Sequence, residues 1–349
     1  MKILPGRSLY LLRLRAWFQV AVIAALAGAV GRLYAYTLWL WGQAPGAAAA
    51  VPPAAPPPVP PLVEAFLPGQ ALAGARVWLA GHGFDPVHPA GLTIFLAALA
   101  MSLLARRGFC AFFCPVGYLC EGLNRLGRRL SLSRRPGRLV STLISLPKYL
   151  LLALLLWFVF VQVAPADLAV WLLGPANKGA ASDLLRPFLA PSANLLIPLG
   201  LILAGSVLVP GFWCRGFCPY GALLGLLALF SPLAVWRDRK KCTYCRRCTR
   251  LCPARLPVHE ARRVSGPECR GCLKCLAVCP EPGCLTLRAG YGAGARRLPG
   301  WVLPLLCALV MGGAYLWAVN SGHWESPVLA EENRLRHLLY QQFQPALPP

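Results

Sequence analysis

Eight cysteines between residues 242 and 279 have the spacing that iron-sulfur chemistry requires. They form two runs of Cys-x2-Cys-x2-Cys-x3-Cys-Pro, in which three close thiolates wrap one 4Fe-4S cube and the fourth cysteine ligates the other cube. We therefore predict two 4Fe-4S clusters, the first on Cys242, Cys245, Cys248 and Cys279 and the second on Cys252, Cys269, Cys272 and Cys275. Zinc is disfavoured, because zinc modules normally place two cysteine pairs about a dozen or more residues apart.

A second cysteine pattern, Cys-x-x-Phe-Cys-Pro-x-Gly-x-Leu, occurs twice along the chain. One copy contains Cys110 and Cys114, and the other contains Cys214 and Cys218. The repetition implies a two-helix unit used twice, and spacing i, i+4 would put both thiols on one helix face. The four thiols could form redox-active pairs or together hold a metal centre, and buried small side chains are the alternative.

Three remaining cysteines, Cys120, Cys284 and Cys307, have no partner at such a spacing. We interpret them as structural, because free cysteine is often buried like a small apolar residue.

The elements that position these residues are predicted to be membrane helices. The chain is 57% hydrophobic and 13% charged, with a mean hydropathy of +0.56, which disfavours a soluble globular enzyme. Apolar stretches long enough, or nearly so, to cross about 30 Å of hydrocarbon predict five spans. These are residues 16–42, 88–105, 147–166, 194–213 and 299–319. The run Leu223–Val235 is too short to cross and is expected to be interfacial or re-entrant, and Ala44–Pro61 is an Ala/Pro spacer.

The charge distribution predicts the orientation of these spans. The chain carries 35 Lys and Arg against 12 Asp and Glu, and 29 of the 35 fall on one side if the N-terminus is cytoplasmic. The positive-inside rule therefore accounts for the basic balance, and binding to nucleic acid becomes an unnecessary hypothesis. The first apolar run is longer than that of a cleaved signal peptide, so an uncleaved span is favoured.

The predicted fold is a polytopic α-helical membrane protein with a small two-cluster ferredoxin module. Cytoplasmic segments are 1–15, 106–146, 214–240 and a linker at 288–298, and the module occupies 241–287. Exported segments are the loops 43–87 and 167–193 and the tail 320–349. Because the module lies on the reducing cytoplasmic side, disulfides are disfavoured.

From about Arg15 to Cys284 the sequence resembles the membrane polyferredoxins of the NapH/MauN kind. Both Cys-x3-Cys-Pro units and all eight ferredoxin cysteines occur in family order. The resemblance implies a four-span quinol dehydrogenase component of the bacterial cytoplasmic membrane, which passes electrons from quinol to a protein partner. The fifth span and the tail depart from that pattern. NosR-like regulators are disfavoured because residues 43–87 contain no Ser or Thr to accept a flavin, and CcoG-like proteins because the tail is too short for their exported domain.

The expected function is electron transfer between membrane quinone and a protein redox partner. No nucleotide fingerprint, phosphate loop or haem motif is recognisable, so metal and thiol groups must carry the chemistry. Two alternatives stay open: an assembly or maturation factor for a membrane metalloenzyme, and a cluster-based redox regulator. Neighbouring genes for a terminal reductase would favour electron transfer from quinone, and genes for an oxidase or for copper handling would favour an assembly factor.

A quinol head group needs a nearby group that accepts its protons. His82, Asp85 and His88 form the one dense titratable cluster on the predicted exported side, where the chain enters the second span. We therefore consider them a candidate quinol site. A helix N-cap and ordinary surface histidines are the alternative interpretation.

Overall fold

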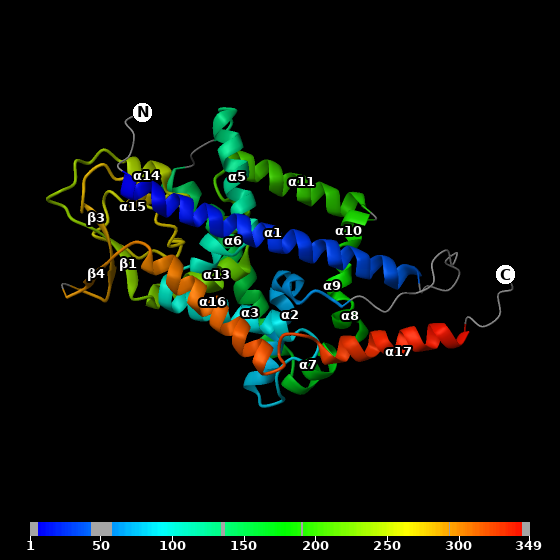
Figure 1. Ribbon diagram of the computed structural model, residues 1–349. Coiled ribbons are helices and arrows are strands. Elements are labelled where there is room, and N and C mark those ends of the chain that lie inside the picture. Colours follow the sequence, from blue (N-terminus) through cyan, green and yellow to red (C-terminus); the bar gives the residue numbers. More distant parts are fainter. Residues whose placement is uncertain (1–5, 43–57, 134–136, 190, 293, 344–349) are drawn as a thin grey trace. The chain divides into compact units, whose positions relative to one another are not determined.

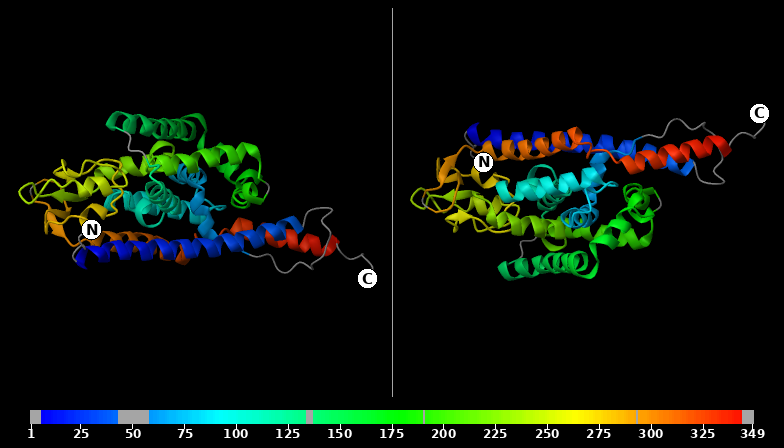
Figure 2. Two further views of the ribbon diagram at one scale, coloured as in Figure 1. Left: turned by 90° about the horizontal axis from the view of Figure 1, so that it is seen from above. Right: turned by 90° about the horizontal axis from the view of Figure 1, so that it is seen from below.

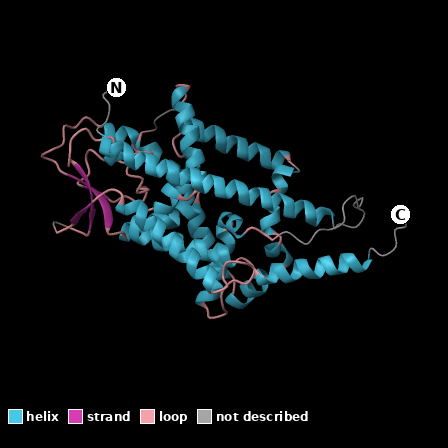
Figure 3. Ribbon diagram, viewed as in Figure 1, coloured by secondary structure: helices cyan, strands magenta, loops and turns pink. Residues whose placement is uncertain are grey.

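The computed structural model describes residues 6–42, 58–133, 137–189, 191–292 and 294–343. These residues are mainly helical and include one small sheet (Figure 3). The chain divides into two compact units, of which the first comprises residues up to 23, 97–156 and 197–313. All of the cysteines belong to this first unit, and the second unit comprises the rest of the chain.

Three helices among the described residues are long and apolar enough to cross a membrane (Figure 1). The apolar windows are Tyr10–Trp39 within α1 (Gly6–Gly42), Thr142–Gln162, and Val302–Asn320, which is α16. The middle window runs through α6 (Arg138–Trp157) into a π-helical turn at Phe158–Gln162. It begins before the predicted start at residue 147, because Pro147 lies inside α6. These candidate spans correspond to the predicted first, third and fifth spans and indicate a multi-pass membrane protein.

The predicted second and fourth spans are shorter helices. They are α3 (Pro89–Ala105), with 17 residues, and α11 (Ala193–Leu208), with 16. A 16-residue helix covers about 24 Å, which is less than the roughly 30 Å of a hydrocarbon core. Each helix is followed by a left-handed residue, Arg106 at φ 60° after α3 and Gly211 at φ 67° after α11. The arrangement of five spans therefore remains a prediction.

Each Cys-x3-Cys-Pro motif joins two helices. In the first copy Cys110 lies in α4 (Gly108–Phe112) and α5 (Pro115–Arg129) begins at the proline. In the second copy α12 (Phe212–Gly216) precedes α13 (Pro219–Leu227) in the same way. The prediction that spacing i, i+4 places both thiols on one helix face is wrong, because the second cysteine lies outside both helices, just before the proline that begins the next.

The second cysteine of each motif is the N-cap of the following helix. The Sγ of Cys114 accepts from the backbone N–H of Gly117 at 3.4 Å, and that of Cys218 from Gly221 at 3.2 Å. The glycine is required by close approach, since a Cβ at Gly117 would lie 2.8 Å from the carbonyl oxygen of Cys110. The shared Cys-Pro-x-Gly spacing is thus a helix start with a sulfur cap.

The sheet is antiparallel, with strand order β2-β1-β3-β4. The strands are β1 (Leu233–Arg237), β2 (Arg263–Val264), β3 (Leu285–Ala289) and β4 (Arg296–Leu298). In the central pair Val235 is opposite Leu287, and all of β1 is buried. The membrane-interface interpretation of Leu223–Val235 is therefore wrong at its end, because Leu233–Val235 lie in the buried strand β1.

The connection from β1 to β3 carries all eight ferredoxin cysteines and two short helices. These are α14 (Arg247–Leu251) and α15 (Lys274–Ala277). Each follows a left-handed residue, Arg246 at φ 58° and Leu273 at φ 55°, which turns the chain back between neighbouring cysteines. The sheet thus brings together the two ends of the cysteine-bearing segment.

The predicted exported segments contain helices where loops were expected. They are η1 (Pro61–Phe66), α2 (Pro68–Leu79), α7 (Pro165–Leu172), α8 (Pro175–Lys178), α9 (Ala180–Asp183), α10 (Arg186–Leu189) and α17 (Pro327–Phe343). Most of the Ala/Pro spacer, residues 43–57, lies outside the described residues. Within the second unit, Ala29 and Leu33 of α1 pack with Val63 and Ala181 in one apolar cluster.

The start of α1 lies beside the start of α16 in the first unit. Both views in Figure 2 show these segments, coloured blue and orange, side by side. Gly300, just before α16, approaches Leu11 of α1 so closely that a Cβ there would collide with the leucine side chain. The start of the last candidate span is therefore packed on the start of the first.

Candidate metal centres

Four of the ferredoxin cysteines surround one cavity. Cys242, Cys245 and Cys248 line it together with Cys279, which comes from the second run. Cys284 lines the same cavity and is buried, with its thiol donating to the carbonyl oxygen of Asp238 at 3.7 Å. Burial, Cys279 and Cys242 raise the pKa of Cys284 to about 12. Sequence spacing gave no sign that Cys284 lies at this site.

The other four cysteines form a second group. Burial raises the pKa of Cys252 to about 12, and the nearby charges of Cys272 and Cys269 add to that rise. Burial also raises the pKa of Cys275, again with contributions from Cys272, Cys252 and Cys269. Cys252, from the first run, therefore lies within electrostatic range of the second run.

The donor chemistry of both groups fits a cubane better than a single ion. Among the described residues, no three His, Cys, Asp or Glu side chains converge closely enough to hold one metal ion. A 4Fe-4S cube carries one thiolate on each iron, so its four sulfurs lie farther apart than the ligands of one ion. The four thiols of the first group, around their shared cavity, suit that larger group.

The four thiols of the repeated motif lie within electrostatic range of one another. Burial raises the pKa of Cys114, and the charges of Cys110, Cys214 and Cys218 raise it further. Burial and Cys214 similarly raise the pKa of Cys218 to about 11. The two motifs, far apart in the sequence, thus contribute to one group of thiols.

Cys120 lies next to this group, and Cys307 packs elsewhere. The Sγ of Cys120 lies 4.0 Å from the Oγ of Ser206, and the neighbouring Cys120 thiol lowers the pKa of Cys214. Cys307 is fully buried against Gly108, where a Cβ would lie 2.5 Å from its sulfur. Cys120 is therefore a neighbour of a candidate ligand, although its spacing suggested a structural residue.

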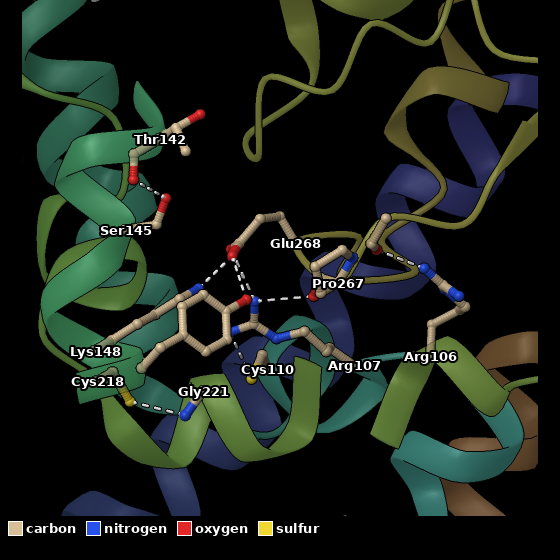
Figure 4. A network of polar contacts seen from close by, with 12 residues as sticks. Arg106, Arg107, Cys110, Thr142, Ser145, Lys148, Cys218, Gly221, Pro267 and Glu268 are labelled. Atoms are coloured by element: carbon tan, nitrogen blue, oxygen red, sulfur yellow. Dashed lines mark hydrogen bonds and ion pairs between the residues drawn. The ribbon is translucent and has the colours of Figure 1, made fainter. Parts of the chain in front are cut away.

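Two adjacent arginines before the first motif hold the loop that leads into Cys269 (Figure 4). Arg106 donates to the carbonyl oxygens of Ala228 and Gly266, each at 2.6 Å. The Nη1 of Arg107 lies 3.1 Å from Oε2 of Glu268, and its Nη2 lies 4.0 Å from the sulfur of Cys110. Arg107 thus connects a motif thiol to the residue that precedes a predicted cluster ligand.

Glu268 is the buried acid at the centre of this network. Its carboxylate also forms an ion pair with Lys148 of α6 and accepts from the Tyr149 hydroxyl at 3.3 Å. Burial alone would raise the pKa of Glu268, but Arg107 and Lys148 outweigh burial and hold it below its usual value. The carboxylate is therefore ionised and fixes the dicluster loop to α6.

A second buried acid, Glu121 of α5, performs a similar role at α15. It pairs with Arg15 of α1 at 2.7 Å, with Arg125 at 2.6 Å, and with Lys274, the residue before Cys275. Burial opposes ionisation, but Arg15 and Lys274 hold the pKa of Glu121 well below its usual range. Both loops of the second cysteine run are thus anchored by ion pairs to helices of the first unit.

The predicted quinol residues do not share one accessible site. Asp85 is buried, and its Oδ1 accepts from the backbone N–H groups of Val87 and His88 at 2.9 and 3.0 Å. His88 is also buried, with Nε2 2.8 Å from the Asn177 carbonyl oxygen and Nδ1 3.4 Å from Glu64. His82 is exposed. Asp85 binds the turn just before α3, and the backbone N–H of Gly91 in the first turn of α3 donates to Oε2 of Glu64 at 2.7 Å. The N-cap expected at Asp85 is therefore supplied by Glu64, which sequence reasoning missed.

Comparison with known proteins adds a family assignment to this geometry. The model of the 4Fe-4S binding domain matches residues 87–133 and 193–241, so each match contains one Cys-x3-Cys-Pro motif. The model of the 4Fe-4S dicluster domain matches residues 234–280. These matches indicate that the chain holds iron-sulfur clusters.

Similar proteins are found among ferredoxin-type membrane components. The candidate electron transport protein YccM of Escherichia coli is 30% identical over 323 residues, covering 90% of this chain and 86% of YccM. The ferredoxin-type protein NapH of Escherichia coli is 28% identical over 68% of this chain and 78% of NapH. The methylamine utilization ferredoxin-type protein MauN of Paracoccus denitrificans is 26% identical over 49% of this chain and 56% of MauN. No solved structure matches.

Proposed function

The chain belongs to the membrane ferredoxin family of NapH, MauN, NosR and NirI. From that premise we propose that it exchanges electrons between membrane quinone and a protein partner. Iron-sulfur electron transport, the general role, follows from membership of the family. The observation that carries the proposal is the network that fixes the dicluster loops to the membrane helices. Arg107, Lys148 and Glu268 connect the motif thiols to the second cysteine run. The dicluster module is thereby held against candidate membrane spans.

The proposed ligands are those predicted from the sequence. Cys242, Cys245, Cys248 and Cys279 would hold one 4Fe-4S cluster around their shared cavity, and Cys252, Cys269, Cys272 and Cys275 would hold the other. When bound, each cluster supplies a one-electron redox centre. A quinol releases two electrons and two protons when it becomes a quinone, so two such centres match its electron count. Gly271 permits the close packing involved: it is left-handed, and a Cβ there would lie 3.1 Å from the Ala105 carbonyl oxygen.

The motif thiols are proposed to hold a further metal centre. Cys110, Cys114, Cys214 and Cys218 influence one another electrostatically. Arg270 and Arg107 lie near Cys214, and positive charge favours the thiolate form that metal ligation requires. A pair of redox-active thiols is the alternative, and it would leave the iron content at that of the dicluster module alone.

A basic groove is the proposed docking site for an acidic redox partner. The groove has a volume of about 390 Å³ and is lined by Arg237, Arg239, Lys240, Arg262 and Arg288, with Asp238 as its one acid. Arg237 also lies close enough to Cys242 to lower the pKa of that thiol against the effect of burial. Charge complementarity of this kind raises association rates and is weakened by salt.

Metal analysis of the purified full-length protein tests the cluster assignment. Two clusters predict about eight iron atoms per chain, and a third 4Fe-4S centre on the motif thiols predicts about twelve. Cys114→Ser and Cys218→Ser should then each remove about four iron atoms, whereas Cys307→Ser, at a buried cysteine outside the site, should remove none. About one zinc with little iron would refute the proposed electron-transfer function.

A further inference from the structure

A cavity of about 240 Å³ lies in the first unit, between the ends of the membrane helices and the second cysteine run. Its apolar wall includes Leu12 of α1, Pro210 after α11, and Leu251 and Val278 of the dicluster module. Leu12 lies two residues inside the apolar window of α1, and Pro210 lies two residues beyond the end of α11. The cavity is therefore at the depth where an apolar ligand held in the bilayer would meet the module.

The polar side of the cavity includes a buried donor that has no hydrogen-bond acceptor among the described residues. Arg270 lines the cavity and is 5% exposed, and the charges nearest to it are those of the Cys214, Cys110 and Cys272 thiols and of Glu121. No hydrogen bond or salt bridge joins its guanidinium to a described residue. Glu121 and Lys274 also line the cavity but are paired with each other. A buried guanidinium with free N–H groups is costly unless an acceptor completes it. Arg270 thus points to a ligand that brings an acceptor oxygen.

The cavity also borders residues next to the proposed ligands of the second cluster. Pro253 follows Cys252, Lys274 precedes Cys275, and Arg270 follows Cys269. Cys120, beside the motif thiol Cys214, also lines the wall. A ligand bound here would lie between the two groups of thiols in the first unit.

We propose that this cavity binds the head group of a membrane quinone, with Arg270 donating to one ring oxygen. This inference rests on the proposed function and names where its quinone binds. A quinone ring is flat and apolar and carries two acceptor oxygens, which fits an apolar wall with a buried donor. The cavity lining also holds Lys274 and Arg125, which pair with Glu121, and the exposed Arg128. The site replaces the exported-side position considered from His82, Asp85 and His88.

Binding of a short-chain quinone to the purified full-length protein tests the proposal. Leu12→Trp should fill the cavity and weaken binding at least tenfold without changing a polar group. Val20→Trp, at an exposed position of the same helix, is its control and should leave the dissociation constant unchanged. Arg270→Gln should weaken binding about tenfold, because a charged donor to the ligand is lost. Arg128→Ala should weaken binding, whereas its neighbour Arg129→Ala, which does not line the cavity, should not.

Photolabelling with an azidoquinone locates the site independently. Label is expected on the peptides around Asn124 and Gly211, which line the cavity, and excess unlabelled quinone should prevent it. Label near His82, or an unchanged dissociation constant in Leu12→Trp, would overturn the proposal. Loss of bound phosphatidylglycerol without loss of quinone binding in these variants would assign the cavity to an anionic lipid and also overturn it.

Failure of this inference is distinguishable from failure of the proposed function. If quinol reduces the wild-type protein and reduces Leu12→Trp at the same rate, the proposed function stands and the site is refuted. If wild type exchanges no electrons with either quinol or quinone, the proposed function itself fails. Arg270 neighbours Cys269, so iron content is measured for every variant, and Leu12→Trp keeps the test valid if Arg270→Gln loses iron.

Discussion

Replacing Glu268 by Gln removes the one acid shared by two buried cations. The Arg107 side chain is 2% exposed and that of Lys148 is fully buried, while Glu268 is 13% exposed. Glutamine retains the shape but not the charge, so both cations would remain buried without a counter-ion. Removing one partner of a buried ion pair costs about 3–5 kcal/mol. We expect Glu268→Gln to lower the free energy of unfolding by about 3 kcal/mol or more by the same principle.

The matched control is Glu331→Gln, which breaks an exposed pair with Arg334 at 3.9 Å. Exposed pairs contribute about 0–1 kcal/mol, so this variant should be nearly neutral. Unfolding is followed in detergent solution by loss of the visible absorbance of the iron-sulfur clusters and by circular dichroism. Equal stabilities of the two variants would refute the inference that Glu268 fixes the dicluster module to α6.

Three further predictions concern other residues. Cys252→Ser should destroy the cluster that Cys269, Cys272 and Cys275 share, as seen by electron paramagnetic resonance, and selective loss of the other cluster would contradict the crossed assignment. Asp85→Ala should destabilise the protein by about 1 kcal/mol or more, because the buried N–H groups of Val87 and His88 lose their acceptor. His82→Ala should leave both stability and the rate of quinol oxidation unchanged, and a slower rate in that variant would restore the exported-side site. The pKa of Glu121 is depressed in the folded state, so the stabilisation by its carboxylate is present above its ordinary pKa of about 4.5 and is lost as pH falls below that value. The difference in unfolding free energy between wild type and Glu121→Gln should therefore be constant from about pH 8 to 5 and shrink at lower pH. A difference that grows on acidification would contradict this prediction.

The sequence predicted those parts of the site that depend on local spacing. Both cysteine runs and the two Cys-x3-Cys-Pro motifs are recognisable in the sequence because their members are a few residues apart. Their conformation was harder to predict: Cys110 and Cys114 were expected on one helix, but Pro115 begins a new helix and makes Cys114 its cap. Spacing predicts which residues act together. The direction in which their side chains point depends on where one helix ends and the next begins.

Contacts between distant residues could not be read from patterns. Arg107 and Lys148 look like ordinary positive-inside charges, and nothing local pairs them with Glu268, which lies 120 residues or more along the chain. Leu233–Val235 was misread because a buried strand and a membrane-facing segment are equally apolar. The cavity around Arg270 likewise forms only when α1, α5 and the dicluster module pack together.

The most direct test of the proposed electron transfer is an anaerobic redox titration of the purified full-length protein, monitored by electron paramagnetic resonance. We predict signals of at least two 4Fe-4S clusters, and electron exchange with a membrane quinone analogue, seen either as cluster reduction by the quinol or as oxidation of the reduced protein by the quinone. Cluster signals that respond to dithionite but to neither form of the quinone would contradict the account.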